Sequence, residues 1–351
     1  MRHGTTVHRP QLDALRGIAV IAVLIHHFLP VDRLIPSDFF TLGLLAVRLF
    51  FVLSGYLITG ILLRSRRLSF RDALGRFYFR RALRIFPIYY IALTAAAVFN
   101  APFVREFFAW HLLYLSNVLS IIHPTMLGPT GHLWTLSVEE QFYFVWPFVI
   151  LLVPYRHLLK VVLGIIAAGV AWKMLVAAML GDNLLGAIVT PACLDSLGIG
   201  AFLAFVESDA NLRGRIDDIL RLFWMAGIAI VCAQSVVLFT HRGMRIFWSP
   251  TQYFGVSLLF AWIIARAAEG FSGGLGALLE TKPLLYLGKI SYGIYLYHLF
   301  VLFLVRFLFR SRGIVPGTLA TFVTASGLTL AIATVSWHVI ERPISRWKES
   351  R

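Results

Sequence analysis

Charged residues are scarce in this chain: they make up 14% of its 351 residues, against about 25% in an average soluble domain. Hydrophobic residues make up 59%, a composition that excludes an ordinary soluble globule and a disordered chain. Cysteine is nearly absent as well. Cys193 and Cys232 both lie in apolar stretches, and a pair without ligand spacing excludes a disulfide framework or a cysteine zinc site.

Several catalytic signatures are missing too. The chain has no Gly-rich phosphate loop, no G-x-S-x-G elbow and no H-E-x-x-H zinc motif, and we expect no metal. Acids are few, 17 against 32 Lys and Arg, which leaves a net charge of +15. In a soluble protein this excess would suggest nucleic acid. A mean hydropathy of +0.79 instead favours loop charges of a membrane protein, so we expect membrane lipid and no nucleic acid as partner.

Ten apolar runs are long enough to cross a membrane as helices. Such a helix needs about 20 mainly apolar residues, and these runs are separated by polar, Pro or Gly residues. The sequence therefore predicts an all-α protein, a polytopic membrane helix bundle with about ten spans and a short re-entrant or interfacial segment at 107–122. The predicted spans are residues 13–30, 42–63, 84–101, 138–153, 159–180, 188–206, 219–240, 250–268, 288–309 and 316–340.

Basic residues are distributed unevenly between the two sides of these spans. If the N-terminus is cytoplasmic, 23 of the 32 Lys and Arg fall in inner segments, as the positive-inside rule describes. We therefore expect both termini in the cytoplasm. No polar stretch is long enough to fold separately, so we expect a single integral-membrane domain, 1–351, without an appended soluble domain.

The first span carries ionisable groups, which are costly in a membrane and are therefore candidates for function. Arg16 and His27 are 11 residues apart, which in a helix places them on one face and about 16 Å apart along the axis. This stripe links a cation at the cytoplasmic rim to an imidazole deep in the membrane. The alternative is a snorkelling arginine and a hydrogen-bonded core histidine. His26 points about 100° away and is the weaker candidate.

Arginines are concentrated between the second and third predicted spans, from Arg64 to Arg84, which we expect to be a loop. Guanidinium forks suit phosphate, so a phosphorylated cytoplasmic ligand is one interpretation, and an anchor on anionic lipid is the other. For Arg80, Arg81 and Arg84 we favour the ligand. These three lie where the third span begins, and Arg80 and Arg84 share a helix face at i, i+4.

Two acids stand at the start of the fourth predicted span. Ser137 has the position of a helix cap, with Glu140 as its capping-box partner three residues later. This leaves Glu139 free to face the interior of the bundle. Asp195 and His298 are further ionisable groups inside spans, where such side chains either connect helices or serve function.

Seven segments carry a recognisable pattern. They are LDALRGIAVIAVLIHHF (12–28), VRLFFVLSGYLITG (47–60), RRALRIFPIYY (80–90), HLWTLSVEEQFYFVWP (132–147), LDSLGIGAFLA (194–204), LGKISYGIYLYH (287–298) and ERPISRW (341–347). In this order they resemble the acyltransferase 3 family, multi-spanning membrane enzymes that O-acylate sugars, polysaccharides, peptidoglycan and macrolides. One segment alone would be weak, but together they cover nearly the whole chain.

The resemblance implies roles for the basic candidates. Arg16 and His27 match the family's first-helix pair, with His27 as the catalytic histidine. Arg80, Arg81 and Arg84 match the cytoplasmic arginine motif associated with the acyl-CoA donor.

The resemblance also distinguishes the two acids of the fourth predicted span. Glu139 matches the family's glutamate, whereas Glu140 holds a more variable position. Many relatives carry an acid where this chain has Arg48, so we expect no catalytic role for Arg48.

These matches imply an O-acyltransferase of the bacterial inner (plasma) membrane, with acetyl-CoA as the expected donor. The acceptor would be a glycan, a lipid-linked sugar or a small glycosylated molecule at the outer side. We expect His27 to act as general base on the acceptor hydroxyl, with Glu139 orienting the imidazole or stabilising its protonated form. An acyl-enzyme on His27 or Ser137 is the competing route.

Two other classes of function compete with the enzyme. One is a secondary transporter or flippase for a lipid-linked sugar or other amphiphile, although such proteins often show inverted repeats, which are not evident in this sequence. The other is a structural or sensor protein that binds anionic lipid, which leaves Arg16, His27 and Glu139 unexplained. Consumption of acetyl-CoA that is lost in His27→Ala distinguishes the enzyme from both.

Overall fold

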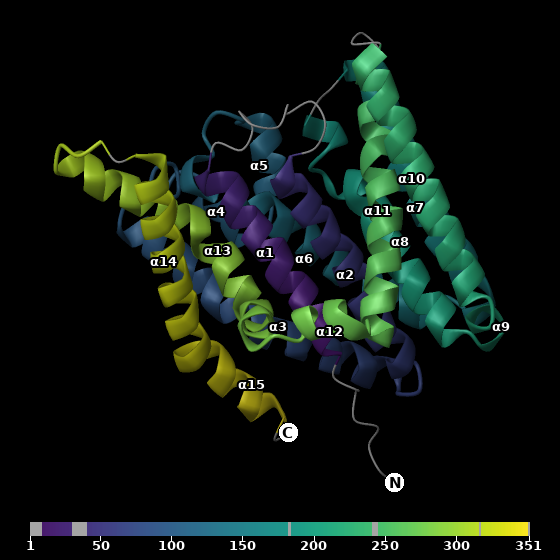
Figure 1. Ribbon diagram of the computed structural model, residues 1–351. Coiled ribbons are helices and arrows are strands. Elements are labelled where there is room, and N and C mark those ends of the chain that lie inside the picture. The colour runs from purple at the N-terminus through teal and green to yellow at the C-terminus, as the bar shows by residue number, and fades with distance from the viewer. Residues whose placement is uncertain (1–8, 30–40, 182–183, 241–244, 316, 350–351) are drawn as a thin grey trace.

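The structure is a computed structural model that describes residues 9–29, 41–181, 184–240, 245–315 and 317–349. Within these ranges the chain is a bundle of helices without strands (Figure 1). The predicted all-α class is confirmed. Ten long helices correspond to the ten predicted spans: α1 (Pro10–Phe28), α2 (Leu42–Ser65), α3 (Phe70–Val98), α6 (Leu133–Leu152), α7 (Tyr155–Leu180), α8 (Thr190–Ser208), α10 (Ile216–Thr240), α11 (Arg245–Glu269), α13 (Lys282–Ser311) and α14 (Thr318–Ser336).

Most of these helices are suited to a bilayer. Among the described residues, eight are long and apolar enough to cross a membrane, or up to nine if α11 and α12 (Gly273–Leu279), which meet at a 90° bend, form one span. α6, which carries Glu139, Glu140 and Gln141, is not among them. The composition of the helices thus fits a multi-pass membrane protein.

Short elements connect the long helices. The segment predicted as re-entrant or interfacial forms α4 (Phe108–Leu112) and α5 (Ser116–Ile122). Figure 1 places these two near the upper end of the bundle, and α12 and α15 (Arg342–Glu349) near the lower end. The remaining short elements are α9 (Ala210–Arg213), the turns η2 (Gly128–Thr130) and η3 (Leu184–Gly186), and the π-helical turn η5 (Trp337–Glu341).

The predicted starts of α3 and α6 are wrong. α3 begins at Phe70, so most of the expected arginine loop is helical, because the Ser69 hydroxyl caps the helix by accepting the N–H of Asp72 at 3.2 Å. α6 begins at Leu133, so Ser137 lies inside the helix and is not its cap. The S-x-x-E pattern was therefore misleading at this position.

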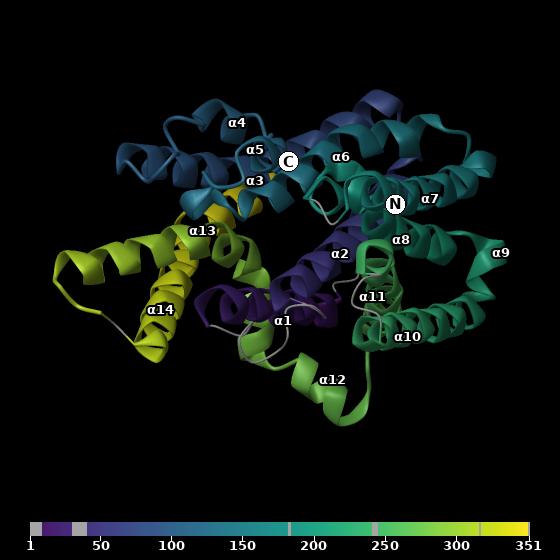
Figure 2. The ribbon, with the colours of Figure 1, turned by 90° about the horizontal axis from the view of Figure 1, so that it is seen from above.

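α2 occupies the middle of the bundle, as the view from above shows (Figure 2). It packs against α1, α3, α6, α8 and α11. Its approach to α8 requires glycine: a Cβ on Gly55 would overlap the carbonyl oxygen of Leu197, and a Cβ on Gly200 would overlap that of Val52. Close backbone approach through small residues is the usual way in which membrane helices associate.

Candidate active site

A cavity between α1, α2, α3, α6 and α13 brings together several of the charged side chains that the sequence singled out. It encloses about 820 Å³ of space, including the solvent at its open mouth. Arg16, Arg81, Arg84 and Glu139 line it together. The other lining residues are Val47, Phe50, Phe51, Ser54, Leu57, Ile85, Thr135, Leu136, Glu140, Tyr143, Ser291, Tyr292 and Tyr295.

The arginines of α3 divide between the cavity and the surface. Arg81 and Arg84, three residues apart, share a face of the helix and line the cavity. The Arg81 guanidinium lies 4.9 Å from the centroid of the Tyr143 ring, at cation–π distance. Arg80 is exposed and is not among the lining residues. The face of α3 that meets the cavity therefore carries Arg81 and Arg84, spaced i, i+3. The predicted pair of Arg80 and Arg84, spaced i, i+4, does not meet it.

Arg16 reaches the same cavity from α1. Its guanidinium forms an ion pair with Asp13 at 3.2 Å, and both side chains are about one-fifth exposed, at 20% and 18%. The cavity therefore receives cations from two helices.

A short hydrogen-bonded chain holds Glu139 in the cavity. The Ser54 hydroxyl of α2 donates to the Glu139 carboxylate, and the Tyr143 hydroxyl donates to Ser54 Oγ at 2.9 Å. Glu140 lines the cavity as well. The structural role expected for Glu140 is absent, because neither acid lies in the first turn of α6.

The Ser137 side chain is not part of the cavity. Its side chain is fully buried, donates to the Leu133 carbonyl at 3.2 Å and accepts the Ser116 N–H at 3.1 Å. The geometry therefore gives no support to an acyl-enzyme on Ser137.

His27 lies further along α1, which is one uninterrupted helix from Pro10 to Phe28. It is not among the residues that line the cavity. Its Nδ1 hydrogen-bonds to the Val23 carbonyl at 3.0 Å, and its ring meets that of His298 with centroids 4.8 Å apart. Tyr295 joins the two regions, since its side chain lines the cavity and its ring centroid lies 5.4 Å from that of His298.

Comparison with known sequences identifies the family to which this arrangement belongs. Residues 9–338 match the sequence model of the acyltransferase 3 family, described as an acyltransferase domain. The chain belongs to the acyltransferase 3 family. The resemblance carried by the seven segments is thereby confirmed. No solved structure matches the chain.

Curated relatives match along nearly all of this acyltransferase 3 chain. O-acetyltransferase OatA of Staphylococcus aureus (strain NCTC 8325 / PS 47) is 27% identical over 359 residues, 96% of this chain and 57% of the relative. The putative peptidoglycan O-acetyltransferase YrhL of Bacillus subtilis (strain 168) is 31% identical, over 98% of this chain and 56% of the relative. Peptidoglycan O-acetyltransferase OatA of Listeria monocytogenes is 27% identical, over 96% and 56%. The chain therefore spans a little over half the length of these relatives.

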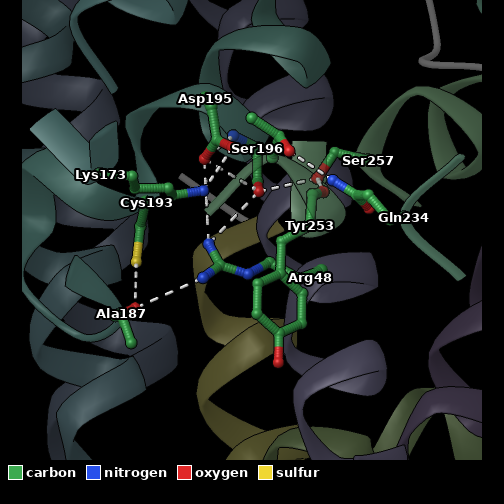
Figure 3. Close-up of polar contacts among 10 residues, drawn as sticks. Arg48, Lys173, Ala187, Cys193, Asp195, Ser196, Gln234, Tyr253 and Ser257 are labelled. Atoms are coloured by element: carbon green, nitrogen blue, oxygen red, sulfur yellow. Dashed lines mark hydrogen bonds and ion pairs between the residues drawn. The ribbon is translucent and has the colours of Figure 1, made fainter. Parts of the chain in front are cut away.

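This acyltransferase 3 chain also holds a buried ionic cluster outside the cavity (Figure 3). The Asp195 carboxylate of α8 accepts a hydrogen bond from the Lys173 ammonium of α7 at 2.5 Å. It also lies 3.9 Å from the Arg48 guanidinium of α2. All three side chains are at most 1% exposed. The Arg48 guanidinium also stacks over the Tyr253 ring of α11 at 4.9 Å. Asp195 thus connects three helices, which is the structural alternative left open for it by the sequence.

Sequence reasoning missed six polar residues of the cavity: Ser54, Thr135, Tyr143, Ser291, Tyr292 and Tyr295. The tyrosines among them are unremarkable in a chain that contains 12 Tyr. The available signal was position: Tyr143 follows Glu139 by four residues, one helical turn, and Tyr295 precedes His298 by three. Ser54 carried no comparable signal, because its contact with Glu139 joins two helices 85 residues apart.

Proposed function

We propose that this protein is a membrane O-acyltransferase that moves an acyl group, with acetyl as the first choice, from cytoplasmic acyl-CoA to a hydroxyl of a glycan at the outer side of the membrane. The observation that carries the proposal is the cavity in which Arg16, Arg81, Arg84 and Glu139 meet. The family and the O-acetyltransferase relatives supply the reaction class.

The donor site is assigned to the arginines of the cavity. Coenzyme A carries phosphates at one end and a thioester at the other, and arginine forks bind phosphate with strong, charge-assisted hydrogen bonds. Arg81 and Arg84 would hold the phosphates, and the pantetheine arm would pass Arg16 through a cavity lined mainly by apolar and aromatic side chains. The predicted contribution of Arg80 is a contact with the exposed part of the donor.

His27 is assigned the general base. In the proposed reaction the His27 imidazole takes the proton from the acceptor hydroxyl, the alkoxide attacks the thioester carbonyl, and the proton leaves on the sulfur of coenzyme A. Glu139 is assigned to the electrostatic support of the imidazolium. Tyr295, which touches both the cavity and His298, marks the path along which the thioester reaches His27.

Binding of acetyl-CoA to the detergent-purified protein tests the donor site. Calorimetry should show binding to the wild type and to His27→Ala, and a loss of about 100-fold or more in the variant that carries both Arg81→Ala and Arg84→Ala, since each hydrogen bond to a charged group contributes about 1.5–3 kcal/mol. Arg76→Ala is the matched control, because Arg76 is an exposed arginine of α3 outside the cavity. Arg80→Ala in the same assay measures the predicted contribution of that residue.

Turnover tests the base. Release of free coenzyme A from acetyl-CoA, with soluble peptidoglycan fragments as acceptor, should occur in the wild type and be lost in His27→Ala while donor binding remains. Failure of the wild type to bind acetyl-CoA would contradict the donor assignment and favour the transporter or flippase hypothesis. Full turnover in His27→Ala would contradict the base.

A further inference from the structure

The cavity ends about one helical turn short of the proposed base. On α13 it is lined by Ser291, Tyr292 and Tyr295, and His298 follows the last of these by three residues. The His298 ring meets the His27 ring of α1 with centroids 4.8 Å apart, and neither ring lines the cavity. The thioester of a donor bound in the cavity therefore has to pass the level of Tyr295 before it reaches His27.

Two hydroxyls from different helices meet at that level. Thr135 of α6 and Tyr295 of α13 both line the cavity, and their side-chain oxygens lie 2.7 Å apart, so one hydroxyl donates to the other. Thr135 is the lining residue nearest the start of α6. That start lies beside the histidines, because the His132 ring that precedes it is 4.7 Å from the His298 ring. The pair thus stands where the cavity ends toward His27.

Both side chains of this pair are nearly buried, since Thr135 is 5% exposed and Tyr295 is 7% exposed. The Phe50 ring of α2 packs against Tyr295 with centroids 6.0 Å apart. The backbone carbonyl of His132 lies 3.0 Å from the Thr135 hydroxyl and 3.3 Å from the Tyr295 hydroxyl. A carbonyl oxygen has two lone pairs and can accept both protons. The bond between the two hydroxyls can therefore open without leaving either buried proton unsatisfied.

We propose that the hydrogen bond between Thr135 and Tyr295 is a gate: closed, it separates the donor cavity from His27, and open, it lets the acyl end of the donor pass. This inference rests on the proposed function and deepens it. A permanently open path would let water reach the thioester and compete with the acceptor hydroxyl. One neutral hydrogen bond shifts an equilibrium by about 3- to 10-fold, a bias that favours the closed state and that a bound donor can overcome.

The test measures access to position 27 from the side of the membrane on which the N-terminus lies, which is predicted to be cytoplasmic. His27→Cys introduces a thiol at this position. The full chain also carries Cys232→Ser, because Cys232 is exposed whereas Cys193 is buried. The probe is a charged, membrane-impermeant methanethiosulfonate added to inside-out membrane vesicles, and the readout is the rate of labelling. This rate needs neither substrate nor activity.

Four substitutions are compared in that background. Tyr295→Phe and Thr135→Val each remove one hydroxyl of the gate and nearly keep the size of the side chain. Thr135→Ser keeps the hydroxyl. Tyr292→Phe is the matched control, because it removes a hydroxyl of the cavity wall that donates to the Ile85 carbonyl at 3.3 Å and is not part of the gate.

The expected result is faster labelling where the gate loses its hydrogen bond. Tyr295→Phe and Thr135→Val should be labelled about 3- to 10-fold faster than the parent, the effect of one neutral hydrogen bond. Thr135→Ser and Tyr292→Phe should be labelled at the parent rate. The same reagent added to right-side-out vesicles should label all variants alike, since the gate closes only the path from the cavity.

Each contrary outcome has a distinct meaning. If Tyr295→Phe and Thr135→Val are labelled at the parent rate, or if Thr135→Ser is labelled as fast as Thr135→Val, the inference is overturned. Faster labelling from both sides of the membrane would show a general loosening of the bundle and would overturn it as well.

The proposed function is tested separately, in the chain that keeps His27. If that chain binds acetyl-CoA and releases coenzyme A while the gate substitutions leave the labelling rate unchanged, the proposed function stands and only the gate fails. If the chain neither binds acetyl-CoA nor releases coenzyme A, the proposed function itself fails.

Discussion

Replacing Asp195 by Asn should destabilise the protein more than any other single change in the buried ionic cluster. Among the residues that the structure describes, the carboxylate is the one anion of that cluster, and it neutralises two cations, Lys173 at 2.5 Å and Arg48 at 3.9 Å. Both cations are buried, Lys173 on α7 and Arg48 on α2, so water cannot take over the solvation of either. Removing one partner of a buried ion pair costs about 3–5 kcal/mol, because the remaining charge is left uncompensated.

Lys173→Met provides the comparison. Asp195 then keeps Arg48 and the backbone N–H of Ser196, which lies 2.8 Å from its carboxylate. We therefore expect Lys173→Met alone to cost about 1–2 kcal/mol, of the order of one hydrogen bond to a charged group. In the Asp195→Asn background the sign should reverse. There Lys173 is an unpaired cation beside Arg48, so its removal should raise stability.

The assay is the free energy of unfolding in mixed micelles, measured by titration with a denaturing detergent for the wild type, both single variants and the double variant. The reversal of sign for Lys173→Met between the two backgrounds is the decisive observation, and a double-mutant cycle isolates it from unrelated effects. Equal costs for the two single variants, or a loss below about 1 kcal/mol for Asp195→Asn, would refute the argument that the carboxylate neutralises both cations.

Three further predictions follow from named contacts. Gly200→Ala should lower the free energy of unfolding by about 2–3 kcal/mol or prevent folding, because the new Cβ overlaps the backbone of α2. Gly164→Ala is the control, because no atom lies within 4 Å of its Cβ, and an equal loss of stability in both variants would contradict the packing argument. Thr59→Val should lower the free energy of unfolding by about 1–2 kcal/mol, because the Trp146 indole N–H donates to the Thr59 hydroxyl at 2.8 Å and would lose this acceptor. An unchanged unfolding midpoint would contradict this prediction. Glu139→Gln should lower kcat by about 100-fold with acetyl-CoA binding retained, as measured by turnover and calorimetry, and a loss of binding instead would assign Glu139 to the donor site.

Most of the fold could be predicted from local sequence. Every predicted span corresponds to a helix, because in a membrane a helix is the simplest way to satisfy all backbone hydrogen bonds within one segment. The errors arose at polar boundaries. The helix from Phe70 and the early start of α6 depend on Ser69 and on packing around Ser137, which periodicity does not report.

The amino-acid sequence by itself determined the class, the family and the candidate charges. Arg16, His27 and Glu139 were visible as ionisable groups in predicted spans, where they are costly, and Arg81 and Arg84 were visible as members of an arginine cluster suited to phosphate. Their assembly was decided only by tertiary structure. Which arginines of α3 meet α1 and α6, which hydroxyls reach a carboxylate, and which histidines touch behind the proposed base are relations between segments far apart in the chain. They follow from helix rotation and close approach, which depend on the shapes of all neighbouring side chains at once.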